Sequence, residues 1–160
     1  PYGALKADYE RLLTGNSREV ATKVVVCRPY SLSGRFARSR SSYALFDIID
    51  QAKASESVFL ESTKLVFRRY TDAEEFLALS LASSPGGPPL ESGGELIELG
   101  TLAEKVVSEL NLSCTIRRQP IAGLPDSYHS DNSSFELACA QVGLTPSSLS
   151  EQIRTSSFSQ

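Results

Sequence analysis

Short apolar runs alternate with helical patterns along almost the whole chain, and this alternation constrains the fold more than any other feature of the sequence. Residues 22–27 (TKVVVC) form a continuous β-branched run, which is the pattern of a strand buried in a parallel sheet. Apolar residues at helical spacing precede and follow it, at residues 2–14 and 43–54. Strands that alternate with helices predict an α/β protein with mainly parallel pairing.

The rest of the chain continues the alternation. The expected strands and helices are, in chain order, strands near 57–61 and 65–70, a helix to 82, a strand at 95–99, a helix to 110, a strand at 113–118, and helices at about 132–142 and from 145 onward. The segment 83–94 (SSPGGPPLESGG) offers only Leu90 to a core, so we expect an exposed loop there.

Several residues mark where these helices begin and end. Two T-x-x-E patterns, Thr71–Glu74 and Thr101–Glu104, predict capping boxes. Gly143 is a stop signal, and Pro146 predicts the first turn of the last helix. The apolar face of the helix before residue 83 is expected to consist of Ala73, Phe76, Leu77 and Leu81.

Composition limits the class of protein. The 160 residues are 41% hydrophobic and 22% charged, which suits a soluble globular domain, and the net charge of −3 gives no bulk attraction to nucleic acid or to anionic membranes. No apolar run approaches the roughly 18 residues that a membrane span needs. We therefore expect a cytoplasmic protein with neither nucleic acid nor membrane as a partner.

The cysteines and the single histidine argue against a metal site. Cys27, Cys114 and Cys139 are far apart and odd in number, so they are interpreted as buried thiols rather than disulfides. No C-x-x-C pattern exists, and His129 is the only histidine, interpreted as a surface residue.

The first helix carries the one pair of residues that points to catalysis. Tyr2 and Lys6 are four apart, so they project from one side of the helix. A nearby ammonium favours the phenolate form of tyrosine, which makes the phenol a better acid/base near neutral pH. The plainer interpretation is a surface lysine lying over a half-buried ring, because this spacing also occurs by chance in helices.

A second feature points to an anion. No acidic residue occurs between Val20 and Phe46, while five basic residues fall in this stretch: Lys23, Arg28, Arg35, Arg38 and Arg40. A net-acidic protein that gathers arginines in one Ser/Gly loop is suited to hold a phosphate-bearing ligand. Alternatively, these arginines lie in solvent or pair with carboxylates that are distant in sequence.

Five segments in one order carry a family resemblance. PYGALKADYERLL holds Tyr2 and Lys6, and KVVVCRPYSLSG holds an arginine-proline-aromatic turn at 28–30. LVFRRYTDAEEFLALSLA, GELIELGTLAEKVVSEL and QVGLTPSSLSEQIRT follow. Together they resemble the C-terminal half of the extended short-chain dehydrogenase/reductase family, the NAD-dependent epimerases and dehydratases of sugar nucleotides. The resemblance spans essentially all 160 residues.

The resemblance implies a domain organisation. Residues 1–30 would end an NAD(P)-binding Rossmann domain whose N-terminal part is missing, and 31–160 would form mainly a small mixed α/β substrate-binding lobe. Residues 72–100 would return to the parallel Rossmann sheet. The family's glycine-rich cofactor turn has no match here, so we expect a truncated chain that neither binds NAD tightly nor turns over alone.

The resemblance also assigns roles to individual residues. Tyr2 would be the catalytic acid/base and Lys6 would assist it and hold the nicotinamide ribose of NAD or NADP, with Pro29 and Tyr30 beside the nicotinamide. Ser31 stands where the family often has an asparagine that touches the sugar nucleotide, and serine lacks that amide. Arg38 is a further candidate contact to the nucleotide-sugar substrate.

One of two adjacent arginines would hold the substrate's diphosphate. Arg68 and Arg69 lie on the strand expected at 65–70, and an arginine fork can donate two parallel hydrogen bonds to phosphate oxygens. We favour Arg69, although strand alternation leaves Arg68 open, and both arginines would otherwise form a solvated strand end.

The function implied for the full-length protein is sugar-nucleotide epimerisation, 4,6-dehydration or 4-keto reduction, in a homodimer. The alternatives are a family member acting on another carbonyl or alcohol, or a non-catalytic NAD(P)-binding or regulatory member of the same fold. Retention of both Tyr2 and Lys6 favours the enzyme, because a binding protein has no need of a perturbed phenol.

Overall fold

The fold is mixed α/β, as the alternation predicts, and it is described here from a computed structural model. The structure describes residues 2–16, 24–36 and 43–158. Six helices and nine short strands lie within these ranges. The expected strand at 22–27 falls partly outside them. Its described part ends in β1 (Cys27–Arg28), and main-chain hydrogen bonds to the carbonyls of Val24 and Val26 precede β1.

The strands pair mostly in parallel, which confirms the prediction. β1 pairs with β6 (Leu90–Glu91), β2 (Leu32–Ser33) with β5 (Thr71–Asp72), and β3 (Ser57–Leu60) with β8 (Thr115–Arg118), all in parallel. β4 (Val66–Arg69) is central to a three-stranded sheet, parallel to β9 (Asp126–Ser127) and antiparallel to β7 (Leu96–Glu98). The segment 83–94 is therefore not only a loop, because Leu90 is buried within β6.

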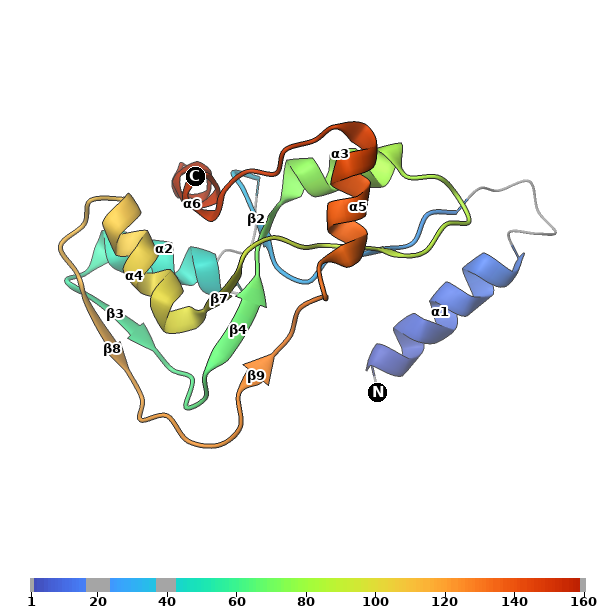
Figure 1. The fold of residues 1–160 in the computed structure, drawn as a ribbon. Coiled ribbons are helices and arrows are strands. Elements are labelled where there is room, and N and C mark those ends of the chain that lie inside the picture. Colours follow the sequence, from blue (N-terminus) through green and yellow to red (C-terminus); the bar gives the residue numbers. More distant parts are fainter. Residues whose placement is uncertain (1, 17–23, 37–42, 159–160) are drawn as a thin grey trace.

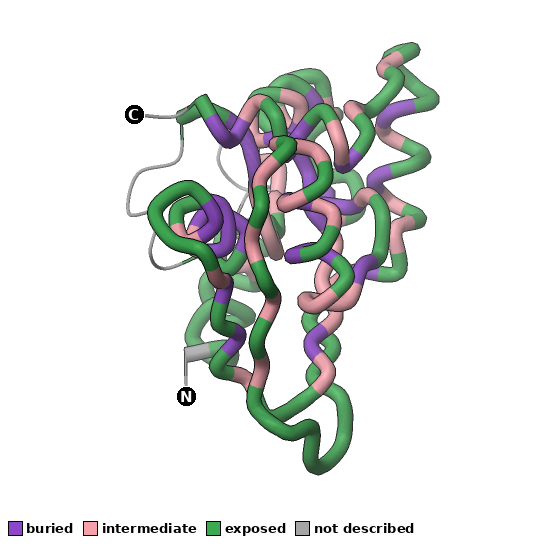
Figure 2. The backbone as a smooth tube through the Cα atoms, turned by 90° about the vertical axis from the view of Figure 1, so that its left-hand side faces the viewer, coloured by how far each residue is buried: buried purple, intermediate pink, exposed green. Residues whose placement is uncertain are grey.

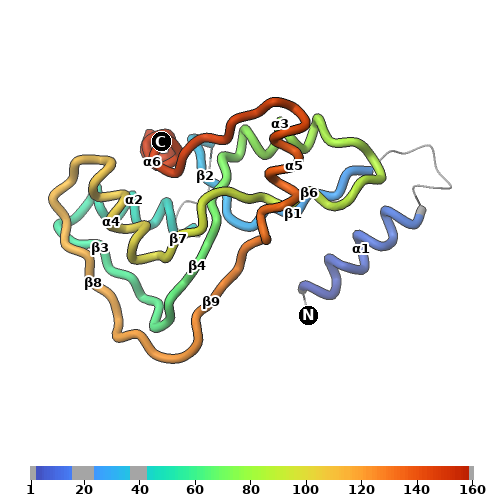
Figure 3. The backbone as a smooth tube through the Cα atoms, in the orientation of Figure 1, coloured from blue at the N-terminus to red at the C-terminus, as the bar shows by residue number. Residues whose placement is uncertain are grey.

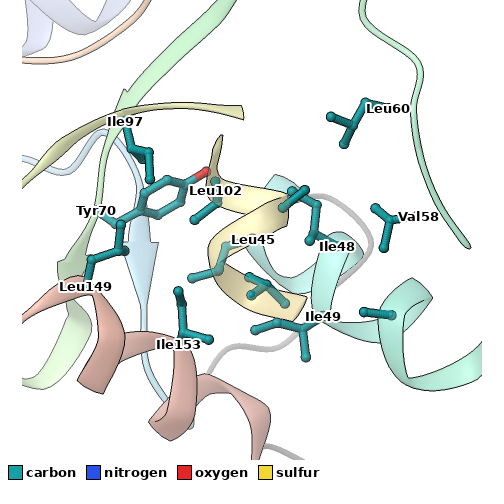
Figure 4. Close-up of a cluster of buried hydrophobic side chains, with 13 residues drawn as sticks. Leu45, Ile48, Ile49, Val58, Leu60, Tyr70, Ile97, Leu102, Leu149 and Ile153 are labelled. Carbon is teal, nitrogen blue, oxygen red and sulfur yellow. The ribbon is translucent and has the colours of Figure 1, made fainter. Parts of the chain in front are cut away.

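The main core lies among three helices and the β3–β8 pair. α2 (Ala44–Ala54), α4 (Leu99–Glu109) and α6 (Leu149–Ser157) pack together beside these strands (Figure 1). Leu45, Ile49 and Ile153 point into the shared interior and are fully buried (Figure 4). Buried stretches are spread over several parts of the tube in Figure 2, whereas the long loop at its lower end is exposed.

A second, smaller core joins α3 (Ala73–Ala82) to α5 (Ser133–Val142). Phe76 and Leu79 of α3 are buried in it, whereas Leu77 and Leu81 are 59% and 80% exposed. The apolar face predicted for this helix was therefore half wrong, because the packed stripe runs through Leu79.

The predicted helix caps were wrong at three positions. α3 is capped by Asp72, whose carboxylate accepts from the N–H groups of Glu74 and Glu75, while Thr71 belongs to β5. α4 begins at Leu99 with Glu98 as its cap.

α6 begins at Leu149 behind a Ser148–Glu151 capping box, three residues after Pro146. At all three helix starts, the free backbone N–H groups are instead satisfied by acidic side chains or by a serine that pairs with a glutamate. Gly143 ends α5 with a φ of 67°, as predicted.

α1 (Tyr2–Asn16) confirms the first predicted helix but stands apart from both cores (Figure 1). Its apolar residues Leu5, Tyr9, Leu12 and Leu13 are 54–60% exposed. None of the helices in the described residues combines the length and apolar character that crossing a membrane requires.

Candidate functional site

A cleft of about 570 Å³ lies between α1 and the segment 24–30. α1 and this segment run in opposite directions along it (Figure 3). The later residues of α1, including Leu13, therefore share one end with Val24 and Val25, whereas Lys6 shares the other end with Pro29 and Tyr30. The cleft is apolar at one end and carries charged and phenolic groups at the other.

Three of the predicted cofactor contacts line this one cleft. Lys6, Pro29 and Tyr30 come from two separate segments, and the fold brings them together. Tyr2 lies one helical turn before Lys6 in α1. Ser31 is half-buried next to Tyr30, and its carbonyl accepts a hydrogen bond from the Thr71 N–H at 3.2 Å.

A bridge of charges crosses the polar end of the cleft. Arg28 Nε and Nη2 donate to the two carboxylate oxygens of Glu10 at 3.0 and 2.6 Å, and Nη1 donates to Glu91 Oε1 at 3.0 Å. The hydrogen bond from Arg28 lowers the pKa of Glu10 below its ordinary range. α1, β1 and β6 therefore meet at one guanidinium.

Two tyrosines form the wall beside this bridge. The Tyr30 and Tyr128 ring centroids are 5.0 Å apart, with the ring planes tilted by 57°. Burial, together with the negative charge of Glu91, raises the pKa of Tyr30, whose hydroxyl donates to Glu91 Oε1 at 3.4 Å. Tyr128 also lines the cleft, and our sequence analysis did not identify it because no pattern links it to Tyr30.

The two candidate phosphate-binding arginines have different hydrogen-bond partners. Arg68 Nη2 pairs with Asp126 Oδ2 at 2.7 Å, and its guanidinium lies 5.8 Å from the Tyr128 ring centroid. Arg69 instead donates to two main-chain carbonyls, those of Gly94 at 2.6 Å and Ser130 at 3.2 Å. Arg68 thus lies beside the cleft wall, whereas Arg69 links the two segments that contain Gly94 and Ser130.

The arginine-rich stretch does not gather as one anion site in the described residues. Arg28 pairs with Glu10 and Glu91, and Arg35 pairs with Glu74 at 3.1 Å. These two arginines follow the alternative interpretation, pairing with carboxylates distant in sequence. The other candidates, Lys23, Arg38 and Arg40, lie outside the described residues.

The histidine and the three cysteines form no arrangement for catalysis or metal binding in the described residues. His129 is partly exposed, and its Nδ1 lies 2.8 Å from the Ser130 carbonyl. Cys139 is buried, whereas Cys27 and Cys114 are half-buried, and all three are free thiols. Across residues 2–16, 24–36 and 43–158, no group of three or more His, Cys, Asp or Glu side chains is arranged to hold a metal ion.

Within the residues that the structure describes, β6 is the one strand paired with β1, and the other edge of β1 faces no strand. Val24, Val26 and Arg28 accept hydrogen bonds through their carbonyls from Gly86, Leu90 and Ser92, at 3.1, 2.9 and 3.1 Å. Because alternate residues of a strand direct their backbone groups to opposite sides, Val25 and Cys27 present theirs away from β6. Both residues line the cleft.

The comparisons with known proteins agree on the fold. No protein-family model and no curated protein matches the sequence. Among solved structures, UDP-N-acetylglucosamine 4-epimerase from Methanobrevibacter ruminantium M1 matches with a TM-score of 0.76 and 19% identity, over 98% of this chain and 52% of the other. UDP-glucuronic acid 4-epimerase from Bacillus cereus matches with a TM-score of 0.75 and 18% identity, over 98% and 51%.

A third similar structure extends this group. RMD from Pseudomonas aeruginosa, solved with NADPH, has a TM-score of 0.75 and 16% identity, over 98% of this chain and 54% of its own. The chain spans about half the length of each of these three solved structures. It therefore has the α/β fold of the C-terminal part of sugar-nucleotide epimerases.

Proposed function

We propose that the chain is the C-terminal half of an NAD(P)-dependent enzyme that epimerises, dehydrates or reduces a nucleotide-linked sugar. The observation that carries the proposal is the cleft in which Lys6, Pro29 and Tyr30 meet, on a fold shared with such enzymes. The similar Bacillus cereus epimerase was solved with NAD and UDP-glucuronic acid, and the Pseudomonas protein with NADPH.

The polar end of the cleft would hold the nicotinamide end of such a cofactor. Lys6 would donate hydrogen bonds to ribose hydroxyls, and the Tyr30 and Tyr128 rings would form an aromatic wall beside it. When bound, NAD(P) would supply hydride transfer. Tyr2 would move a proton at a sugar hydroxyl or carbonyl, and the Lys6 ammonium would favour its phenolate.

The open strand edge gives the missing half a place to attach. We propose that a parallel strand of the cofactor-binding half pairs with Val25 and Cys27, so that residues 1–30 complete a Rossmann domain. β6 pairs with β1 on the other side, which supports a return of residues 72–100 to the same sheet. The remainder of 31–160 would form the substrate lobe.

Arg68 is the better candidate for the substrate's diphosphate. It stands beside Tyr128 at the cleft wall, and its partner Asp126 is half exposed, so a phosphate can replace that carboxylate. Two donors of Arg69, Nε and Nη1, are already directed to part-buried main-chain carbonyls. This reverses the preference that the sequence gives.

The test is turnover by the full-length protein. UDP-sugars are incubated with NAD or NADP, and product formation is followed by chromatography. Tyr2→Phe and Lys6→Met should each lower kcat by at least about 100-fold, because each removes part of the proton-transfer pair. Tyr43→Phe is the matched control, since it removes a phenol that packs on Phe46 and does not line the cleft, and it should leave kcat unchanged.

The outcomes separate the enzyme from its rivals. Full activity in Tyr2→Phe would contradict the proposed acid/base. A full-length protein that binds NAD but converts no sugar would support the non-catalytic alternative. The 160-residue chain alone should show neither tight NAD binding nor turnover.

A further inference from the structure

Arg28 occupies an unusual position for a residue of an arginine-rich stretch. Its guanidinium lies between the carboxylates of Glu10 and Glu91, with Nε, Nη1 and Nη2 all engaged. Both carboxylates already engage this one cation, so the bridge itself carries no excess positive charge with which to hold a phosphate. Arg28 therefore needs a role other than holding an anionic ligand.

The bridge connects the two segments that carry the candidate cofactor contacts. Glu10 lies one helical turn after Lys6 on the same face of α1, so fixing Glu10 against Arg28 also fixes where Lys6 enters the cleft. Glu91 accepts from the Tyr30 hydroxyl as well as from Arg28. One guanidinium thus fixes the positions of both Lys6 and Tyr30 at the cleft.

α1 depends on such a link because its apolar residues do not hold it in place. Leu5 and Leu12 are 54% and 59% exposed, and α1 contributes no side chain to either buried cluster. The Glu10 side chain, by contrast, is only 28% exposed and is held by two hydrogen bonds in the geometry of a bidentate pair. The bridge is also anchored on its far side, because the Glu91 N–H donates to Ser134 Oγ of α5 at 3.1 Å.

We propose that Arg28 is a positioning residue of the nicotinamide site, whose bridge between Glu10 and Glu91 holds α1 against β1 and β6 so that Lys6 and Tyr30 face one cleft. The role in the site rests on the proposed function. The bridge itself does not, and it can be measured without cofactor or substrate.

Hydrogen exchange of the full chain, followed by mass spectrometry, tests the bridge. In Arg28→Gln, the amides of α1 should exchange about tenfold faster, while those of α2 and α4 stay unchanged. Arg28→Lys should recover part of the protection, because an ammonium keeps the charge but not the fork. Arg35→Gln is the matched control, since it breaks a similar pair with Glu74 away from α1.

Three outcomes would overturn the proposal. They are unprotected exchange of α1 in the unsubstituted chain, unchanged α1 exchange in Arg28→Gln, and equal loss of protection throughout the molecule. Glu10→Gln provides a second variant if Arg28→Gln does not fold, because it removes the same link and leaves the Arg28–Glu91 pair.

The full-length protein tests the role in the site. Arg28→Gln should weaken NAD(H) binding several-fold, with partial rescue by Arg28→Lys. Faster α1 exchange with unchanged NAD(H) affinity would overturn the positioning role and leave only a structural bridge. A full-length protein that binds no NAD(H) even unsubstituted would instead refute the proposed function, and the exchange result would stand apart from it.

Discussion

α1 and α2 are both helices with apolar residues at helical spacing, yet one is held by a core and the other is not. On α2, Leu45, Ile48 and Ile49 are at most 1% exposed, packed against α4, α6 and the β3–β8 pair. On α1, Leu5 and Leu12 remain more than half exposed. The difference shows that periodicity predicts a helix and its apolar face, whereas the surface that covers that face need not belong to the same segment of chain.

The largest effect should come from the core around α2. Ile49→Ala removes three buried methyl or methylene carbons at a fully enclosed position, so the free energy of unfolding should fall by about 3 kcal/mol. Urea denaturation followed by circular dichroism measures it. Leu77→Ala on the exposed side of α3 is the control and should change stability by less than about 0.5 kcal/mol. Equal losses of unfolding free energy in both variants would mean that the core around α2 is packed no more tightly than the exposed side of α3.

A smaller effect should come from the ion pair at the start of α4. Glu98 accepts from Arg118 at 3.1 and 3.3 Å and from the Gly100 N–H at 2.7 Å. Burial alone would raise the pKa of Glu98, but these hydrogen bonds outweigh it and the pKa lies below its ordinary 4.5. A lowered carboxyl pKa stabilises the fold above 4.5, and the contribution disappears as the pH falls through the folded-state value.

Glu98→Gln should therefore lower the free energy of unfolding by about 2 kcal/mol at pH 7, with the difference from the unsubstituted chain shrinking below pH 4.5. Urea midpoints at both pH values provide the measurement. Glu104→Gln, on an exposed position of the same helix, serves as the control. A difference that stays constant down to acid pH would show that the carboxylate charge is not what stabilises α4.

Sequence reasoning succeeded where local pattern decides structure. It located α1, α2, α5 and the strands β3, β4 and β8 to within a few residues, because apolar periodicity and stop signals such as Gly143 are local. It missed the short strands β2, β6 and β9, because each pairs at only two positions and with a partner 39 to 63 residues away in sequence. It also chose Thr71 over Asp72 as a cap, since two adjacent residues of capping type cannot be ranked without knowing that β5 takes the first.

The site was predictable to a similar degree. The resemblance placed Lys6, Pro29 and Tyr30 together, and the structure lines one cleft with all three. Tyr128 and the Glu10–Arg28–Glu91 bridge were missed because each joins segments far apart in sequence. The choice between Arg68 and Arg69 depended on which side chain the neighbouring loops capture, and strand alternation alone does not contain that information.

The helix cap of α6 should give an effect of about 1 kcal/mol. Ser148 Oγ accepts from the Glu151 N–H at 3.3 Å, and Glu151 Oε2 accepts from the Ser148 N–H at 2.8 Å. Ser148→Ala removes the first of these bonds and should lower the urea midpoint, whereas Ser148→Thr keeps a capping hydroxyl and should stay close to the unsubstituted chain. Because α6 supplies Leu149 and Ile153 to the main core, an unaffected Ser148→Ala would mean that packing alone defines where α6 begins.

The smallest effect should come from α1. Leu12→Ala deletes a side chain that is 59% exposed and introduces the best helix former, so the free energy of unfolding should change by less than about 0.5 kcal/mol. A loss of several times that size, measured by urea denaturation, would mean that α1 covers its apolar face with something in solution. Protein concentration then identifies the cover, because a second copy makes the loss depend on concentration and a contact within the chain does not. A loss of unfolding free energy that does not depend on concentration would contradict the difference drawn between α1 and α2, because both helices would then be held by packing within the chain.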